Sequence, residues 1–265
     1  MIVSFFSACL LLGCLAGFLA GLLGIGGGLI IVPALVYFLP TVGISNDVIM
    51  PIALATSLAT IVVTSASAVR AHHKNRNIPW SLTRKIMSVI ALGAILGAFI
   101  ADELSGTTLT IIFSVAVITL ACYMLLSIRG TPTREMPATY VLQAIGFGTG
   151  ILASFMGISG GAILVPALSA LGMQLRQTIG VATACGLVVA LFGSLGYIIT
   201  GLDREGLPAL SLGYIYLPAL VGISLTSSLF AKAGVKFAAK LPVKTLKKCF
   251  AVFLILVAIK MIWSI

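Results

Sequence analysis

Two glycine-rich segments contain the residues of this sequence that are best suited to bind a ligand. Residues 24–35 read GIGGGLIIVPAL and residues 157–168 read GISGGAILVPAL. Glycine has no Cβ, so the backbone can leave the helical conformation and approach a ligand closely. A helix that restarts after such a break points free N–H groups, with a partial positive charge, at the break. The pattern therefore predicts an anion site that needs no charged side chain.

The candidate site also includes residues that follow the glycines. Two prolines would bend the restarted helices, and hydroxyls early in the next apolar runs could line the same cavity. The candidate substrate-binding residues are Gly24, Gly26, Gly27, Gly28, Pro33, Thr56, Ser57, Gly157, Ser159, Gly160, Gly161, Pro166 and Thr183. Two alternatives stay open, because small residues also let membrane helices pack closely and hydroxyls often bond carbonyls of their own helix.

An enzymatic interpretation rests on Ser159. Residues 157–160 read GISG, which resembles the nucleophile motif of rhomboid-type intramembrane proteases. A nucleophilic serine needs a general base within hydrogen-bond reach, and the only two histidines, His72 and His73, lie in a basic polar loop. We therefore expect that the protein is not an enzyme. We also expect no cofactor, because the sequence has no pattern of haem, quinone or metal ligands.

The elements that must position these residues are membrane helices. The chain of 265 residues is 60% hydrophobic and 8% charged, whereas a soluble domain carries about 25% charged residues. Its apolar runs approach the roughly 20 residues that a helix needs to cross a bilayer, and they do not alternate as porin strands do. The runs are 3–39, 48–69, 86–101, 108–128, 139–172, 177–200, 212–231 and 245–265.

The chain contains an internal repeat, in which its second half resembles its first. The two glycine segments begin at residues 24 and 157, which are 133 residues apart, and both contain Val-Pro-Ala-Leu. Downstream, Ala55-Thr56 matches Ala182-Thr183. We expect two transmembrane repeats, 1–132 and 133–265, each with about five helical segments and a glycine-broken helix in the matching position.

The basic residues predict how the repeats are oriented. The formal net charge is +10, and the basic residues lie mainly in loops between apolar runs. This favours a role in holding these loops on the cytoplasmic side over a role in nucleic-acid binding. If runs 3–39 and 139–172 each enter the membrane and return to the side from which they entered, fourteen of the sixteen basic residues lie on the cytoplasmic side, all except Arg204 and Lys260. If each crosses once, nine lie inside and seven outside. The first arrangement inverts the halves, puts both termini outside and lets the breaks face each other.

The sequence resembles the sulfite exporter TauE/SafE family, also called toluene-sulfonate uptake permeases. The resemblance rests on GLLGIGGGLIIVPAL, on ASFMGISGGAILVPAL, on the continuation Ala55-Thr56-Ser57 and on the lysine-rich loop before the last run. It implies a multi-pass permease of the prokaryotic inner membrane for sulfite, sulfonates or other small organic anions. Ser159, at the position of Gly26, departs from the repeat and makes the two half-sites chemically unequal.

The expected function is a secondary transporter, with export favoured by the family name, in which alternating access is provided by two inverted repeats. Its expected partners are a small anion and the lipid bilayer, and a homo-oligomer stays open. A passive anion channel and an accessory membrane protein without transport are the alternatives. We read Lys260 as a residue that extends to the outer surface.

Overall fold

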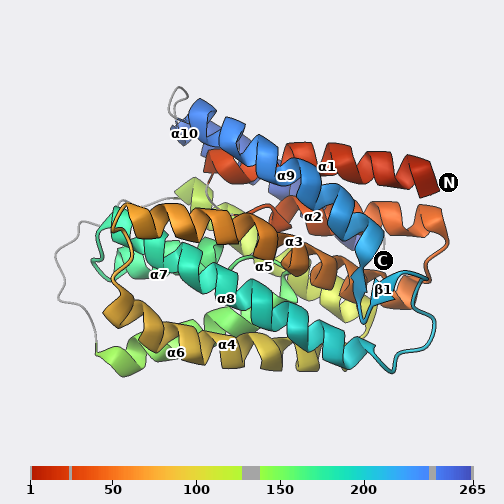
Figure 1. The fold of residues 1–265 in the computed structure, drawn as a ribbon, viewed down its shortest axis with the longest axis horizontal. Coiled ribbons are helices and arrows are strands. Elements are labelled where there is room, and N and C mark those ends of the chain that lie inside the picture. The colour runs from red at the N-terminus through yellow and green to blue at the C-terminus, as the bar shows by residue number, and fades with distance from the viewer. Residues whose placement is uncertain (1, 24–25, 127–137, 239–242, 264–265) are drawn as a thin grey trace.

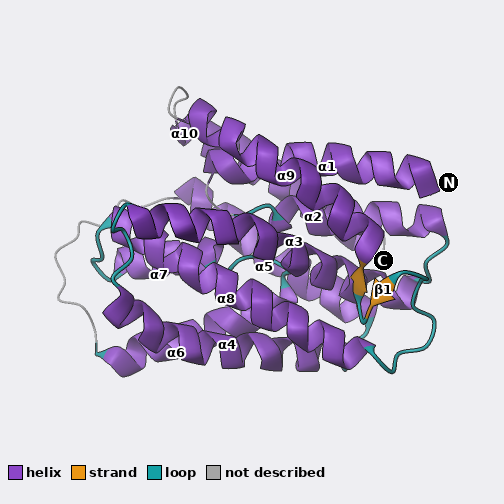
Figure 2. Ribbon diagram, in the orientation of Figure 1, coloured by secondary structure: helices purple, strands orange, loops and turns teal. Residues whose placement is uncertain are grey.

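The computed structural model describes residues 2–23, 26–126, 138–238 and 243–263. These residues form helices joined by short loops and one two-stranded antiparallel hairpin, β1 (Ser211–Leu212) with β2 (Ile215–Tyr216) (Figures 1 and 2). Six of the described helices are long and apolar enough to cross a membrane. The protein is therefore an all-α polytopic membrane protein, as the composition predicted.

The helices follow the same order in each half of the chain. The first half contains α1 (Ile2–Leu23), α2 (Gly28–Phe38) with the 3₁₀ turn η1 (Leu39–Val42), α3 (Asn46–Lys74), α4 (Trp80–Asp102) and α5 (Gly106–Leu126). The second half contains α6 (Thr139–Phe155), α7 (Gly161–Ala170), α8 (Leu175–Gly201), α9 (Leu217–Ala238) and α10 (Val243–Trp263).

Both long apolar runs are divided at their glycine segments. Run 3–39 forms α1 and α2, and run 139–172 forms α6 and α7. Helix α2 has 11 residues and α7 has 10, so each is only about 15 Å long. That is half of the roughly 30 Å hydrocarbon core. The second arm of each pair is therefore too short for a full crossing.

The halves pack through corresponding helices. Helix α1 packs against α9 and α6 against α4, while α3 packs against α8 and α5 against α10. Leu54 and Leu58 of α3 and Val189 of α8 belong to the buried core. Large apolar side chains such as Leu11 and Leu256 are exposed on the outside. Since exposed apolar surface of this extent is unusual in soluble proteins, it fits a lipid-facing surface.

The contacts between helix ends define two ends of the molecule. We name one the acidic end. It contains the starts of α3 and α5, where a Cβ on Gly106 would lie 3.5 Å from the Asn46 carbonyl oxygen. It also contains the ends of α4 and α8, which both contact Tyr214 of the β-hairpin, Asp102 through a hydrogen bond and Gly201 by close backbone approach. The other is the basic end, where Gly180 near the start of α8 contacts Asn77 of the α3–α4 loop and Gln143 near the start of α6 donates to Lys85 near the start of α4. Helix α3 therefore starts at the acidic end, whereas its counterpart α8 ends there. The N-terminus, the C-terminus and β1 lie on one side in Figure 1.

Candidate functional site

The two glycine breaks lie in contact with each other. A Cβ on Gly28 would overlap the Gly157 carbonyl oxygen and lie 3.0 Å from Ile158 Cα, and a Cβ on Gly26 would lie 2.7 Å from Ser159 Oγ. Gly26 and Gly157 have φ angles of +75° and +57°, which L side chains rarely adopt. Glycine is therefore required here both by backbone conformation and by close approach. Gly24 lies outside the described residues.

Two helix N-termini begin at this crossing. Helix α2 has Gly27 as its N-cap and α7 has Gly160, which are equivalent positions of the repeat, and neither N-cap has a side-chain capping hydrogen bond. The first N–H groups of a helix have no acceptor within the helix. The crossing therefore combines backbone donors with the positive ends of two helix dipoles.

The three candidate hydroxyl residues have different neighbours. Ser57 Oγ donates to the Gly157 carbonyl oxygen at 2.6 Å, which ties α3 to the second break. Thr56 Oγ1 accepts the Tyr216 N–H at 3.1 Å, so it anchors the β-hairpin. Thr183 Oγ1 donates to Ile179 of its own helix at 2.7 Å. The structure therefore brings Ser57 to the break, whereas the Thr183 hydroxyl bonds a carbonyl of its own helix.

The second break is more enclosed than the sequence suggested. Gly157, Ser159, Gly160 and Gly161 are all buried. A Cβ on Gly186 of α8 would lie 3.0 Å from Ser159 Cβ, so α8 passes directly beside this serine. Gly186 was missed because an isolated glycine in a long apolar run looks like an ordinary packing residue.

The two prolines lie inside the short helices, and only one reaches the large cavity described below. Pro33 in α2 and Pro166 in α7 both follow the first turn of their helix. Pro33 lines that cavity, and Pro166 is not among its lining residues.

The histidines hold the connection between α3 and α4 together. His73 Nδ1 accepts the Trp80 Nε1–H at 3.0 Å, and His72 Nδ1 lies 3.4 Å from Asn77 Nδ2. These contacts lie at the basic end. They give both rings a local structural role, away from Ser159.

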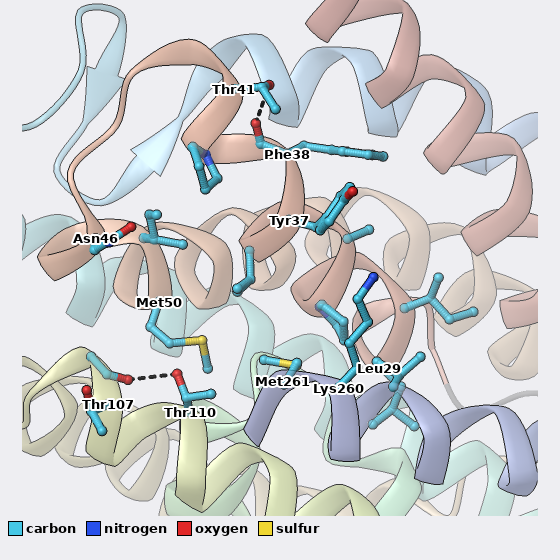
Figure 3. A pocket seen from close by; sticks show the side chains of 18 of the residues that line it. Leu29, Tyr37, Phe38, Thr41, Asn46, Met50, Thr107, Thr110, Lys260 and Met261 are labelled. Carbon is cyan, nitrogen blue, oxygen red and sulfur yellow. Dashed lines mark hydrogen bonds between the residues drawn. The ribbon is translucent and has the colours of Figure 1, made fainter. Parts of the chain in front are cut away.

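A cavity of about 820 Å³ lies between α2, α3, α5 and α10. It extends along α2, from Leu29 and Ile30 directly after the break to Tyr37 and Thr41 (Figure 3). Lys260 of α10 points into it, with Nζ 4.7 Å from the centre of the Tyr37 ring. Sequence analysis missed this cavity. The available signal was a lysine within an apolar run, since ionisable residues in membrane segments often mark functional sites.

A polar contact links the β-hairpin to α4 at the acidic end. Tyr214 OH donates to Asp102 Oδ1 at 2.5 Å, and the Tyr214 N–H donates to the Tyr197 carbonyl oxygen at 3.3 Å. Burial, together with the hydrogen bond to Asp102, raises the pKa of Tyr214 above its ordinary value. Tyr214 therefore keeps its proton and remains a donor that links the hairpin to α4.

The fold and the crossing define a polytopic membrane protein in which broken helices meet in the interior, an arrangement typical of secondary transporters. The sequence profile of the family described as "Sulfite exporter TauE/SafE" matches residues 9–261. The chain belongs to the sulfite exporter TauE/SafE family, which confirms the resemblance.

Several relatives match over almost their whole length. A "Probable membrane transporter protein" of Haemophilus influenzae is 44% identical over 97% of this chain and 98% of its own. The "Probable membrane transporter protein YunE" of Bacillus subtilis is 25% identical over 96% of both chains. The "Probable membrane transporter protein MJ0441" of Methanocaldococcus jannaschii is 26% identical over 90% of this chain and 88% of its own. No solved structure matches the chain. The family and these relatives support membrane transport as the function.

Proposed function

We propose that this protein is a secondary transporter that exports small anions, with sulfite or organosulfonates as substrates, by alternating access. The observation that carries the proposal is the contact between the two glycine breaks, because it brings two helix N-termini without side-chain caps to one crossing. Helix N-termini bind anions through backbone N–H groups and the helix dipole. An anion held in this way needs no buried cation that would trap it.

The packing of the halves supports alternating access. Helix α1 packs against α9, and their equivalents in the other half, α6 and α4, pack against each other in the same way. Helices α3 and α8, which are also equivalent, run in opposite directions between the two ends. These observations favour inverted repeats. Two inverted halves can exchange conformations of similar energy, so the crossing can open first to one side and then to the other.

The unequal half-sites give the anion one preferred position. Ser159 occupies the place that Gly26 has in the first break. A hydroxyl can donate to an anion as well as accept, so a bound oxyanion would lie closer to the second break. The enclosure of Ser159 by Gly186 and α8 favours a small head group.

A thermal-shift screen of the purified protein tests this proposal. The anions are sulfite, sulfate, thiosulfate, taurine and simple carboxylates, each measured with wild type, Ser159→Ala and Ser169→Ala. Ser169 lies in α7, the helix that follows the break containing Ser159, and its buried hydroxyl has no hydrogen-bond partner among the described residues, so it provides a control. A ligand that binds only the folded state raises the unfolding temperature.

We expect a shift with a sulfur oxyanion or sulfonate that is reduced in Ser159→Ala and retained in Ser169→Ala. The absence of a shift with every anion would overturn the proposal. A shift that both variants retain would place the anion away from the second break.

A further inference from the structure

We infer that the cavity beside α2 is a binding site for an organic anion with an apolar body, and that Lys260 binds the charged group. The inference rests on the proposed function and extends it, because the cavity leads from the acidic end to the first break. It gives the protein a preference for organic anions over inorganic ones.

The position of the cavity connects it to the crossing. Leu29 and Ile30 line its inner part and directly follow Gly28, whereas Tyr37, Thr41 and Asn46 line it near the acidic end. The cavity therefore extends along the whole of α2, which is about 16 Å long. An anion that enters at the acidic end reaches the start of α2 without crossing a packed helix.

The charge of the cavity selects an anion. Of the described residues that line it, Lys260 is the only charged one. The Thr41 and Thr110 hydroxyls already donate to the carbonyl oxygens of Phe38 and Gly106, at 2.6 and 2.8 Å. The Lys260 ammonium therefore provides the positive charge of the cavity and three N–H donors.

Tyr37 holds the Lys260 side chain in place. The ammonium lies 4.7 Å from the centre of the Tyr37 ring, within the range of a cation–π interaction. The equivalent residue of the second half, 133 positions later, is Ala170. The aromatic wall is therefore specific to the first half, so this site belongs to the acidic end alone.

The remaining wall fits a hydrocarbon group. Ile49 and Met50 of α3 and Phe253, Val257 and Met261 of α10 line the same cavity as Lys260, and Met261 lies close to Lys260 in Figure 3. Burying CH₂ groups against such a wall removes them from water, which favours binding. An anion with several carbon atoms therefore binds more tightly than an inorganic anion with the same head group.

The test measures binding of butane-1-sulfonate to the purified protein in phosphatidylcholine nanodiscs by calorimetry. Sulfate serves as the probe without a hydrocarbon part, and butyl methyl sulfone as the probe without charge. The variants are Lys260→Gln, Lys260→Arg and the control Lys248→Gln, which changes an exposed lysine of the same helix. Lys260 is itself exposed, so its variants are expected to fold.

We expect Lys260→Gln to weaken butane-1-sulfonate binding about tenfold or more, which is typical for the loss of a charge-assisted hydrogen bond. Lys260→Arg should restore most of the affinity, and Lys248→Gln should bind as wild type does. Sulfate should bind at least about tenfold more weakly than butane-1-sulfonate, because it buries no CH₂ group. Equal affinity of wild type and Lys260→Gln, or of the sulfonate and the sulfone, would overturn the inference.

Two further outcomes separate the inference from the proposed function. Loss of butane-1-sulfonate binding when phosphatidylglycerol is added to the nanodiscs would identify a lipid head group as the occupant and overturn the inference. Vesicle flux with Ser159→Ala reports on the crossing alone. If Ser159→Ala reduces flux and Lys260→Gln does not, only the inference is refuted. If butane-1-sulfonate binds through Lys260 but no anion is transported, only the proposed function is refuted.

Discussion

At the scale of single residues, the crossing depends on the absence of side chains. A Cβ on Gly28 would overlap the backbone of the second break, one on Gly26 would meet the Ser159 side chain, and one on Gly157 would lie 3.0 Å from Leu54 Cα. A methyl group on any of them therefore displaces a neighbouring group. Ser57 adds a hydrogen bond that fixes the second break to α3. At this crossing the first N–H groups of α2 and α7 have no acceptor within their own helices.

The variant Gly28→Ala tests the close contact. Its Cβ would overlap the Gly157 carbonyl oxygen, and backbone atoms cannot move aside as a flexible side chain can. We expect a loss of about 1–3 kcal/mol in the free energy of unfolding, typical of overpacking, and loss of anion flux. Gly148→Ala is the control, because nothing lies within 4 Å of its Cβ. Equal effects of the two variants would show that the breaks do not need their close contact.

The variant Ser57→Ala removes the hydrogen bond to the second break. We expect the free energy of unfolding to fall by about 0.6–2 kcal/mol, the range for hydrogen bonds between membrane helices. Thr183→Val should have a smaller effect, because the Thr183 hydroxyl bonds only its own helix at Ile179. Chemical denaturation in detergent measures both, and a larger loss in Thr183→Val would reverse the roles assigned to these hydroxyls.

At the scale of elements, the short helices α2 and α7 determine the architecture. Each covers about half of the membrane core, and each starts at the crossing and runs toward a different end. At the acidic end, Tyr214 links the hairpin β1–β2 to Asp102 at the end of α4. The hairpin leads directly into α9, so this contact also links the start of α9 to α4.

The variant Tyr214→Phe tests the link between the hairpin and α4. Tyr214 is buried and its hydroxyl donates to Asp102. Loss of a hydrogen bond to a charged group costs about 1.5–3 kcal/mol, so the unfolding temperature should fall clearly. Tyr140→Phe removes a hydroxyl from an exposed side chain and should be neutral. A neutral Tyr214→Phe would show that the hairpin is held by packing alone.

Sequence analysis predicted the elements better than it predicted the site. Helices and their breaks follow from apolar length and from glycine clusters, which act locally, so the divisions of runs 3–39 and 139–172 could be located. The neighbours of Ser57 and Thr183 depend on how distant helices rotate against each other, which no local pattern encodes. The cavity was missed for the same reason, since Tyr37 and Lys260 lie 223 positions apart in the sequence and meet only in the fold.

At the scale of the whole molecule, the distribution of charge follows the two ends. Asp47, Asp102, Glu103, Asp203 and Glu205 belong to helix starts, helix ends or loops at the acidic end. Arg76, Arg84 and Arg176 lie at the basic end. Because cytoplasmic loops are rich in Lys and Arg, we expect the basic end to face the cytoplasm and both termini to face outside.

Cysteine labelling tests this orientation. Asn75→Cys and Lys248→Cys should react with a membrane-impermeant thiol reagent only from the cytoplasm, and Asp203→Cys only from outside, in a background without the native cysteines. All three positions are exposed. Labelling of Lys248→Cys from outside would exclude the inverted arrangement of the two halves.

Counterflow distinguishes a protein that carries anions by alternating between two states from one that conducts them passively. Vesicles that contain the purified protein are loaded with unlabelled sulfite or butane-1-sulfonate and diluted into a trace of the labelled anion. A carrier that alternates between two states exchanges anions, so the label should accumulate transiently above its outside concentration, and this overshoot should be reduced in Ser159→Ala. Label that only equilibrates, without an overshoot, would contradict the carrier mechanism and indicate a passive channel. Vesicles that take up no label would contradict anion transport altogether.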